Sequence, residues 1–199
     1  MTENMNSRNN KIGIFGGTFD PVHNGHLIVA SYAIEHFELN KLFIVPAYIP
    51  PHKKGTFAPY NTRFQWLNSV FSNFDRIEVD NYEGRNSSTS YTIKTVKYFA
   101  KKFNARPFLI IGEDSYNDLE SWYKYEEILD SATICVYPRR IHANSPKSKK
   151  HETVFFFDAP LIDISSSLIR KRISNKKNVL GMIPCTISKE VITFYEEKL

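Results

Sequence analysis

The sequence predicts an α/β fold: a doubly wound parallel sheet with helices on both faces and a small helical part at the C-terminus. Three observations support this prediction. Six short apolar runs recur along the chain, stretches with helical spacing separate them, and a glycine-rich turn joins the first run to the first helical stretch. Strands that alternate with helices form βαβ units, in which the strands are parallel and the crossovers right-handed.

The apolar runs are the predicted strands. They lack the polar alternation of a strand with one wet face, and continuous apolar runs are typical of strands buried on both faces. They cover residues 12–15, 42–45, 77–79, 108–111, 134–137 and 154–157. A sheet of this kind is Rossmann-like, and such open sheets bind ligands at the carboxyl ends of their strands.

Helices are predicted where apolar residues recur at helical spacing, which occurs within residues 27–37, 93–103, 168–173 and 191–195. Two segments have the composition of irregular loops: residues 47–59 are rich in proline, and residues 138–150 are basic. There is no internal repeat and no linker that would divide the chain. We therefore expect a disordered tail at residues 1–10 and a single domain over residues 11–199.

The composition fits a globular protein with a sizeable core, since 42% of the 199 residues are hydrophobic. Lysine and arginine number 26 against 21 acidic residues, which gives a formal charge of +5. An enzyme that handles phosphates and a protein that binds nucleic acid both show such an excess, so charge alone does not separate them.

The cysteines and the lack of long apolar segments bear on the compartment. Cys135 and Cys185 have apolar neighbours and no metal-binding spacing, so we expect two buried free thiols and a reducing compartment. No apolar run approaches the roughly 20 residues that span a bilayer, and the polar N-terminus lacks a signal-peptide core. We expect a cytoplasmic protein with no membrane partner.

The turn after the first predicted strand carries the strongest functional signal. Residues 16–26 read GGTFDPVHNGH, and a helical pattern follows. Adjacent glycines let the backbone approach a phosphate, and N–H groups at the helix start can donate to its oxygens. His23 and His26 share a helix face, so both imidazoles could meet one phosphate and, when protonated, offset its charge. The residues therefore predict a phosphate site.

Three other interpretations of this turn fail. A Walker A loop requires GxxxxGK[ST], and the dinucleotide fingerprint requires GxGxxG, and neither pattern is present. A zinc site would need a third ligand beside the two histidines. GGTFDPVHNGH instead resembles the GxFxPxHxGH signature of the adenylyl/cytidylyl-transferase superfamily. The resemblance implies that His23 and His26 bind the ATP phosphates and stabilise the transition state, and that ATP also contacts Gly16, Gly17, Thr18, Phe19 and Gly25.

Two segments are similar to bacterial nicotinate-nucleotide adenylyltransferases. Residues 45–53, VPAYIPPHK, resemble the VPAxxPPHK segment of that family, in which prolines stiffen the loop and Lys53 supplies a cation. Residues 90–95, SYTIKT, resemble its SYTIxT segment, which implies that Tyr91 and Thr92 approach the nicotinate ring. Ser90 or Thr92 is placed to cap the helix that follows. Lys94 stands where that family has an acidic residue, which we interpret as a surface change.

A third segment, residues 112–128, resembles the family pattern GxD…L..W..W.EI. The resemblance implies that Trp122 stacks on the pyridine ring and that Asp114 lies near the substrate nucleotide, and Tyr123 is expected among the substrate-binding residues. Tyr125 replaces the second aromatic of the pattern. Without these matches, Trp122 would be taken for a core residue.

The fourth segment, residues 164–170, reads ISSSLIR and resembles the family's ISSTxIR. The resemblance implies that Ile164, Ser165 and Ser166 hold ATP. Serines at a helix start present hydroxyl and N–H groups to an anion, and Arg170, one turn into the helix, can make a bidentate phosphate contact. Ser167 replaces the usual threonine and keeps its hydroxyl. We expect Arg170 to act in catalysis together with His23 and His26.

The implied reaction joins nicotinate mononucleotide to the adenylyl group of ATP and gives deamido-NAD and pyrophosphate. Mg²⁺ is expected to be bound through the ATP phosphates, without protein side chains as ligands. Phosphopantetheine adenylyltransferase or another HxGH nucleotidyltransferase is the alternative, although the pantetheine enzymes usually have threonine in place of His23. A non-catalytic nucleic-acid binder using the basic loop at residues 138–150 is a distant alternative, and we expect no nucleic-acid partner. Homo-oligomerisation, and the preference for the acid over the amide, stay open.

Overall fold

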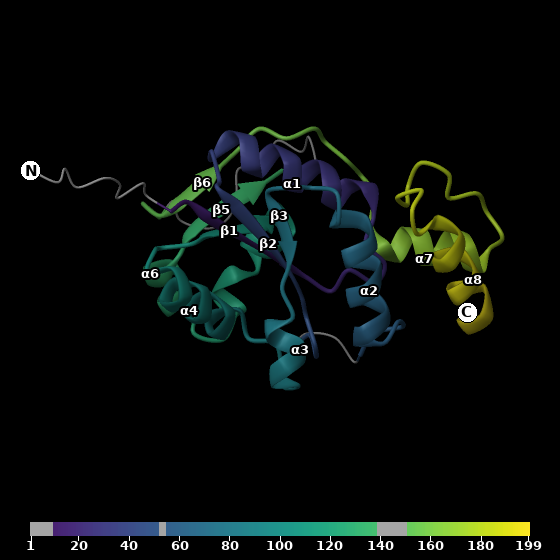
Figure 1. Ribbon diagram of the computed structural model, residues 1–199, viewed down its shortest axis with the longest axis horizontal. Coiled ribbons are helices and arrows are strands. Elements are labelled where there is room, and N and C mark those ends of the chain that lie inside the picture. Colours follow the sequence, from purple (N-terminus) through teal and green to yellow (C-terminus); the bar gives the residue numbers. More distant parts are fainter. Residues whose placement is uncertain (1–9, 52–54, 139–150) are drawn as a thin grey trace, which may run out of the picture.

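The computed structural model describes residues 10–51, 55–138 and 151–199. Its centre is a parallel sheet of six strands in the order β3-β2-β1-β4-β5-β6 (Figure 1). The strands are β1 (Ile12–Gly17), β2 (Lys41–Pro46), β3 (Ile77–Val79), β4 (Phe108–Gly112), β5 (Thr133–Tyr137) and β6 (Val154–Phe156). All six predicted strands are confirmed. The chain leaves β1 toward β2 on one side and later returns to β4 on the other, so the order reverses at β1.

The helices are α1 (Asn24–His36), α2 (Tyr60–Phe71), α3 (Tyr82–Asn86), α4 (Thr92–Phe103), α5 (Glu113–Asn117), α6 (Tyr125–Ser131), α7 (Ser166–Ser174) and α8 (Ser188–Lys198), with a 3₁₀ turn, η1, at Leu119–Ser121. The four predicted helices correspond to α1, α4, α7 and α8, and the last two form the predicted C-terminal helical part. Helices α2, α3, α5 and α6 were not predicted. No helix among the described residues combines the length and apolar character needed to cross a bilayer.

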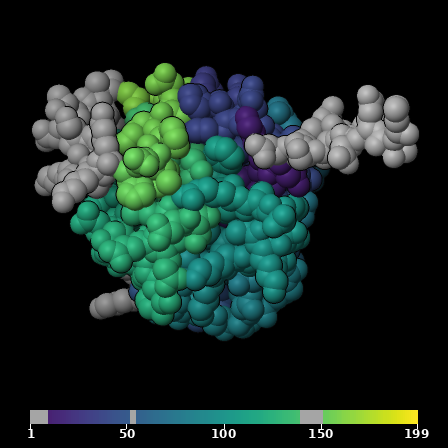
Figure 2. All heavy atoms as spheres, turned by 90° about the vertical axis from the view of Figure 1, so that its left-hand side faces the viewer, coloured from purple at the N-terminus to yellow at the C-terminus, as the bar shows by residue number. Residues whose placement is uncertain are grey.

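The sheet separates two apolar cores, which confirms the doubly wound arrangement. Alternate strand residues face opposite sides, so Ile14 packs with α4 while its neighbour Phe15 packs with α1. Figure 1 shows α4 and α6 on one face and α1 and α2 toward the other. Figure 2 shows the end of the molecule away from α7 and α8, where the lime atoms of the β6 segment lie beside the indigo atoms of α1. The ring contact between Phe37 and Phe157, at 5.3 Å, joins these two segments.

Helix α2 was missed because a charged residue lies on its buried face. Arg63 is 0% exposed and occupies the same face as Trp66, Leu67 and Val70. Two of its guanidinium nitrogens donate to carbonyl groups: Nε to Ala58 O at 3.1 Å and Nη1 to Thr18 O at 2.7 Å. A charge at that position interrupts the apolar pattern from which a helix is predicted.

One of the two cysteine predictions is wrong. Cys135 is a buried free thiol in β5, as expected, but Cys185 is exposed. The turn before α8 buries Ile183, Pro184 and Ile187, and this leaves Cys185 on the outer side of the turn. Apolar neighbours in sequence therefore do not bury a residue in an irregular turn, because such a turn has no fixed periodicity.

The helical C-terminal part is tied to the turn after β1 by a buried carboxylate. Asp20 is 4% exposed, and its oxygens accept hydrogen bonds from the backbone N–H groups of Phe57 (2.8 Å) and Ala58 (3.0 Å). The hydroxyl of Tyr195 in α8 donates to Oδ1 of Asp20 over 2.5 Å. Burial and the neighbouring carboxylate raise the pKa of Tyr195, which keeps it a protonated donor. One side chain thus connects three segments that are far apart in the sequence.

We expect Tyr195→Phe to lower the free energy of unfolding by about 1–3 kcal/mol, because the buried carboxylate of Asp20 loses one donor and keeps the other two. Urea denaturation would measure this change. Tyr32→Phe, in α1, is the matched control because Tyr32 is 40% exposed, and it should leave stability unchanged. Equal midpoints for the two variants would contradict the anchoring role of Tyr195.

Candidate active site

The turn between β1 and α1 forms the floor of two adjoining cavities at the point where the strand order reverses. One cavity, of about 300 Å³, we name the phosphate lobe; it is lined by residues 16–20, His23, His26, residues 165–167 and Arg170, among others. The other, of about 310 Å³, we name the aromatic lobe; it is lined by Tyr91, Thr92, Trp122 and Tyr123, among others. Both lobes share the backbone at residues 16–18, together with Ile111, Ser115 and Trp122.

The two glycines of the turn serve different purposes. A side chain on Gly16 would meet nothing within 4 Å, so the missing side chain leaves open space above the backbone, where a ligand can approach. A Cβ on Gly17 would lie 2.9 Å from the ring of Phe19, which has a positive φ of 50° and is 2% exposed. Gly17 therefore makes room for the buried ring, while Gly16 keeps the lobe floor clear.

His23 and His26 stack on each other where α1 begins. Their ring centroids are 3.6 Å apart with an interplanar angle of 25°, and the backbone N–H of His23 donates to Nδ1 of His26 at 3.1 Å. Because that lone pair is engaged, the neutral His26 ring carries its proton on Nε2, and Nε2–H is the donor it can offer a ligand. The sequence indicated that these rings, when protonated, would offset the charge of a phosphate. Two positive rings at this separation would repel each other.

Helix α7 supplies part of the wall of the phosphate lobe. Ser165 caps it by accepting the N–H of Leu168 at 3.1 Å, and the hydroxyl of Ser166 donates to Pro21 O at 2.8 Å. The start of α7 is thus fastened to the turn after β1. This brings Ser165 and Ser166 into the lobe, as expected.

Arg170 reaches the phosphate lobe but is partly engaged by the protein. Its Nη1 donates to Asp20 O, and its Nη2 donates to Ser167 Oγ at 3.2 Å. The guanidinium lies over the ring of Phe57, with 4.5 Å between Cζ and the ring centroid. A bidentate fork toward a phosphate, as expected from the sequence, would have to use the N–H groups that these two contacts leave.

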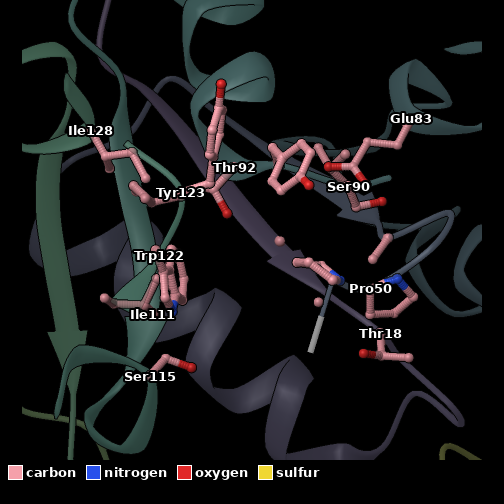
Figure 3. Close-up of a pocket in the computed structure, with 17 residues that line it drawn as sticks. Thr18, Pro50, Glu83, Ser90, Thr92, Ile111, Ser115, Trp122, Tyr123 and Ile128 are labelled. Carbon is pink, nitrogen blue, oxygen red and sulfur yellow. The ribbon is translucent and has the colours of Figure 1, made fainter. Parts of the chain in front are cut away.

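The aromatic lobe collects residues from three strand ends. Figure 3 shows Trp122, Ile111 and Ser115 on one wall, with Thr18, Pro50, Ser90 and Glu83 across from them. Trp122 is half-buried and also packs on the core beside α4, so it both lines the lobe and belongs to the packing below it. The rings of Tyr91 and Tyr123 contact each other at 4.6 Å. The four predicted residues Tyr91, Thr92, Trp122 and Tyr123 are therefore brought together.

The start of α4 differs from the prediction that Ser90 or Thr92 caps it. The residue before the helix is Tyr91, and no side chain caps the first turn. The hydroxyl of Ser90 instead accepts the N–H of Tyr48 at 2.8 Å. The first-turn N–H groups of Thr92 and Ile93 have no acceptor among the described residues. Two backbone donors are thus available beside the aromatic lobe.

Several predicted residues lie elsewhere. Asp114 is exposed in the first turn of α5 and does not line either lobe, although its neighbour Ser115 lines both. Gly25 and Ile164 border a narrow crevice beside the histidine rings, with about 10 Å³ of space. Lys53 and residues 139–150 of the basic loop are outside the described residues, as is most of the predicted tail.

Ser115 and Glu83 were not predicted from the sequence. Ser115 could have been found, since it lies four residues after the end of the predicted strand at residues 108–111. Glu83 lies in α3, half-buried against the aromatic lobe, and desolvation raises the pKa of its carboxyl. The described residues contain no group of three side chains arranged to hold a metal ion. Asp20, the carboxylate in the phosphate lobe, has both oxygens engaged by protein donors.

Comparison with known proteins agrees with this geometry. A family model described as "Cytidylyltransferase-like" matches residues 14–172. A Thermotoga maritima protein named "Probable nicotinate-nucleotide adenylyltransferase" is 44% identical over 98% of this chain and 96% of its own. A Clostridium novyi protein of the same name is 35% identical over 90% and 96%.

The fold is also that of solved relatives. A Plasmodium falciparum nicotinic acid mononucleotide adenylyltransferase complexed with APC matches with a TM-score of 0.76, covering 94% of this chain and 96% of that one, at 21% identity. The same enzyme complexed with NaAD also gives a TM-score of 0.76, at 18% identity and with 94% and 95% coverage. The chain therefore belongs to the cytidylyltransferase-like family of nucleotidyltransferases and, within it, to the nicotinate-nucleotide adenylyltransferases.

Proposed function

We propose that the protein transfers the adenylyl group of MgATP to nicotinate mononucleotide, giving deamido-NAD and pyrophosphate. The names of the full-length relatives support this activity. The observation that carries it in the structure is the pair of lobes of nearly equal size, about 300 and 310 Å³, that share the backbone at residues 16–18. Each lobe suits one nucleotide, and the shared floor is where their phosphates would meet.

The chemistry requires little beyond positioning and charge stabilisation. The 5′-phosphate of the mononucleotide is already anionic, so it can attack the α-phosphorus of ATP in line without a general base, and pyrophosphate leaves. The open space above Gly16 allows the two phosphates to approach each other over the backbone. Binding both nucleotides in adjoining lobes makes the encounter effectively intramolecular, which accounts for a large part of the rate.

Charge that develops on the triphosphate would be met by fixed donors. The phosphate lobe is lined by His26, by Ser165 and Ser166 at the start of α7, and by Arg170. Such preorganised donors stabilise a transition state because they need no reorientation during the reaction.

Magnesium enters this scheme as part of the substrate. Because both oxygens of Asp20 are engaged, the described part of the phosphate lobe offers Mg²⁺ no unengaged carboxylate, and the phosphates themselves would hold it. When bound there, the metal neutralises phosphate charge. The protein's own contribution is the shape of the lobe and its neutral and cationic donors.

The aromatic lobe would select the pyridine ring and its carboxylate. Trp122 and the tyrosine pair Tyr91 and Tyr123 offer flat faces for stacking on an electron-poor ring. The uncapped N–H groups of Thr92 and Ile93 would bind a ring carboxylate, since a helix N-terminus favours negative charge. These donors support nicotinate over nicotinamide as the substrate, and a role for Lys53 stays a prediction.

Turnover with the two mononucleotides tests the proposed substrate. We expect kcat/KM to be at least about tenfold higher for nicotinate mononucleotide than for nicotinamide mononucleotide, because the amide lacks the charge that the start of α4 attracts. Pyrophosphate release, measured with each substrate and saturating MgATP, gives the ratio. Phosphopantetheine serves as the negative control. A preference for the amide, or for phosphopantetheine, would reject the assignment.

The histidine stack is tested by His26→Ala. Removing one preorganised donor of this kind typically lowers kcat about 10²–10³-fold, and we expect a loss in that range at saturating concentrations of both substrates. His36→Ala, in the last turn of the same helix, is the matched control because His36 is exposed and remote from both lobes, and its kcat should stay near wild type. Near-normal turnover in His26→Ala would remove this ring from the chemistry.

A further inference from the structure

Glu83 is a half-buried residue in the wall of the aromatic lobe, and both of its carboxylate oxygens accept hydrogen bonds from the protein. Thr95 Oγ1, in α4, donates to Oε1 at 2.8 Å. The backbone N–H of Tyr48, in the segment after β2, is shared between Oε2 of Glu83 at 3.3 Å and Ser90 Oγ at 2.8 Å. The carboxylate of Glu83 therefore contacts both the segment after β2 and helix α4, which each contribute a wall of the aromatic lobe.

Backbone contacts beside Glu83 also join these two segments. Ser90 donates its backbone N–H to Ile49 O at 2.9 Å, and Ile49 forms an isolated β-bridge with Thr89. The segment after β2 contributes Pro50 and Pro51 to the aromatic lobe, and the segment around Ser90 leads directly into Tyr91 and Thr92. The relative position of these two lobe walls thus depends on two backbone contacts and on the hydrogen bonds of one carboxylate.

The cost of partly desolvating this charged group indicates that it does more than fill space. Glu83 makes no ion pair among the described residues, and desolvation raises the pKa of its carboxyl, although its donors partly offset the effect. A small cavity of about 80 Å³ lies behind it, so the site is not tightly packed there. An apolar residue would be cheaper to bury, but it would leave the N–H of Tyr48 and the hydroxyl of Thr95 with fewer acceptors.

We propose that Glu83 is a positioning residue for the mononucleotide: it holds the segment after β2 against the start of α4, so that Pro50 and the N–H groups of Thr92 and Ile93 face the same ring. This inference rests on the proposed function, because it assigns the aromatic lobe to the mononucleotide. The phosphate lobe is lined by residues of β1, α1, β4, α5, β5 and α7, among others, and does not include Glu83. Loss of Glu83 should therefore weaken the binding of the mononucleotide and leave the binding of ATP unchanged.

Steady-state kinetics of Glu83→Ala and Glu83→Gln test the proposal. We expect Glu83→Ala to raise KM for nicotinate mononucleotide about tenfold or more, the effect of losing roughly one hydrogen bond to a charged group, with KM for ATP within about twofold of wild type. For Glu83→Gln, KM for nicotinate mononucleotide should lie within about threefold of wild type, because the amide oxygen can accept from Tyr48 and the amide nitrogen can donate to Thr95. Glu78→Ala, an exposed glutamate in β3, is the matched control and should match wild type.

The outcomes separate this inference from the proposed function. Equal increases of both KM values, an unchanged KM for the mononucleotide, or a glutamine variant as impaired as the alanine variant would each overturn the positioning role. If Glu83→Ala shows no cooperative thermal transition, Thr95→Val is the deciding variant, since it removes one hydrogen-bond donor to the carboxylate and keeps the carboxylate itself. We expect it to raise KM for nicotinate mononucleotide about threefold, with KM for ATP unchanged. A wild-type protein that forms no deamido-NAD overturns the proposed function itself, and this inference with it.

Discussion

The structure depends most on the buried carboxylate of Asp20. It lies in the turn between β1 and α1 and accepts hydrogen bonds from the backbone of Phe57 and Ala58 and from the hydroxyl of Tyr195. The backbone carbonyl of Asp20 accepts a hydrogen bond from Arg170. The buried guanidinium of Arg63 interacts electrostatically with the Asp20 carboxylate and donates a hydrogen bond to the carbonyl of Thr18. A turn that must leave its centre open for phosphates is thereby held rigid from outside.

This arrangement explains how an exposed, glycine-containing turn can keep a precise shape. Backbone that approaches a ligand closely cannot be supported by its own side chains, so support has to come from neighbouring elements. Here it comes from α2, α7 and α8, which are separated from the turn by up to 175 residues along the chain. The same elements place Arg170 and the start of α7 at the phosphate lobe, so the support and the charge of the site come from the same contacts.

Much of the fold was predictable because its signals are local. Continuous apolar runs identified every strand, and the residue pattern alone located the turn at residues 16–26 at the carboxyl end of β1. Helix α2 was not predicted because Arg63 lies on its buried face, and the burial of Arg63 depends on carbonyl groups that only the folded chain brings near. Within the site, Trp122 and Tyr91 could be found from their motifs. The contacts of Glu83 could not, since its partners Tyr48 and Thr95 lie 35 and 12 residues away.

The most direct test of the account is the protonation of the histidine stack in the presence of a nonhydrolysable ATP analogue. Imidazole ¹⁵N NMR of ring-labelled protein, with His26→Gln to assign the signal, reports which ring nitrogen carries the proton. The hydrogen bond from the backbone of His23 predicts a neutral His26 with its proton on Nε2, and the analogue should shift that signal. A proton on Nδ1 of His26, or a spectrum unchanged by the analogue, would contradict a phosphate site built on this turn.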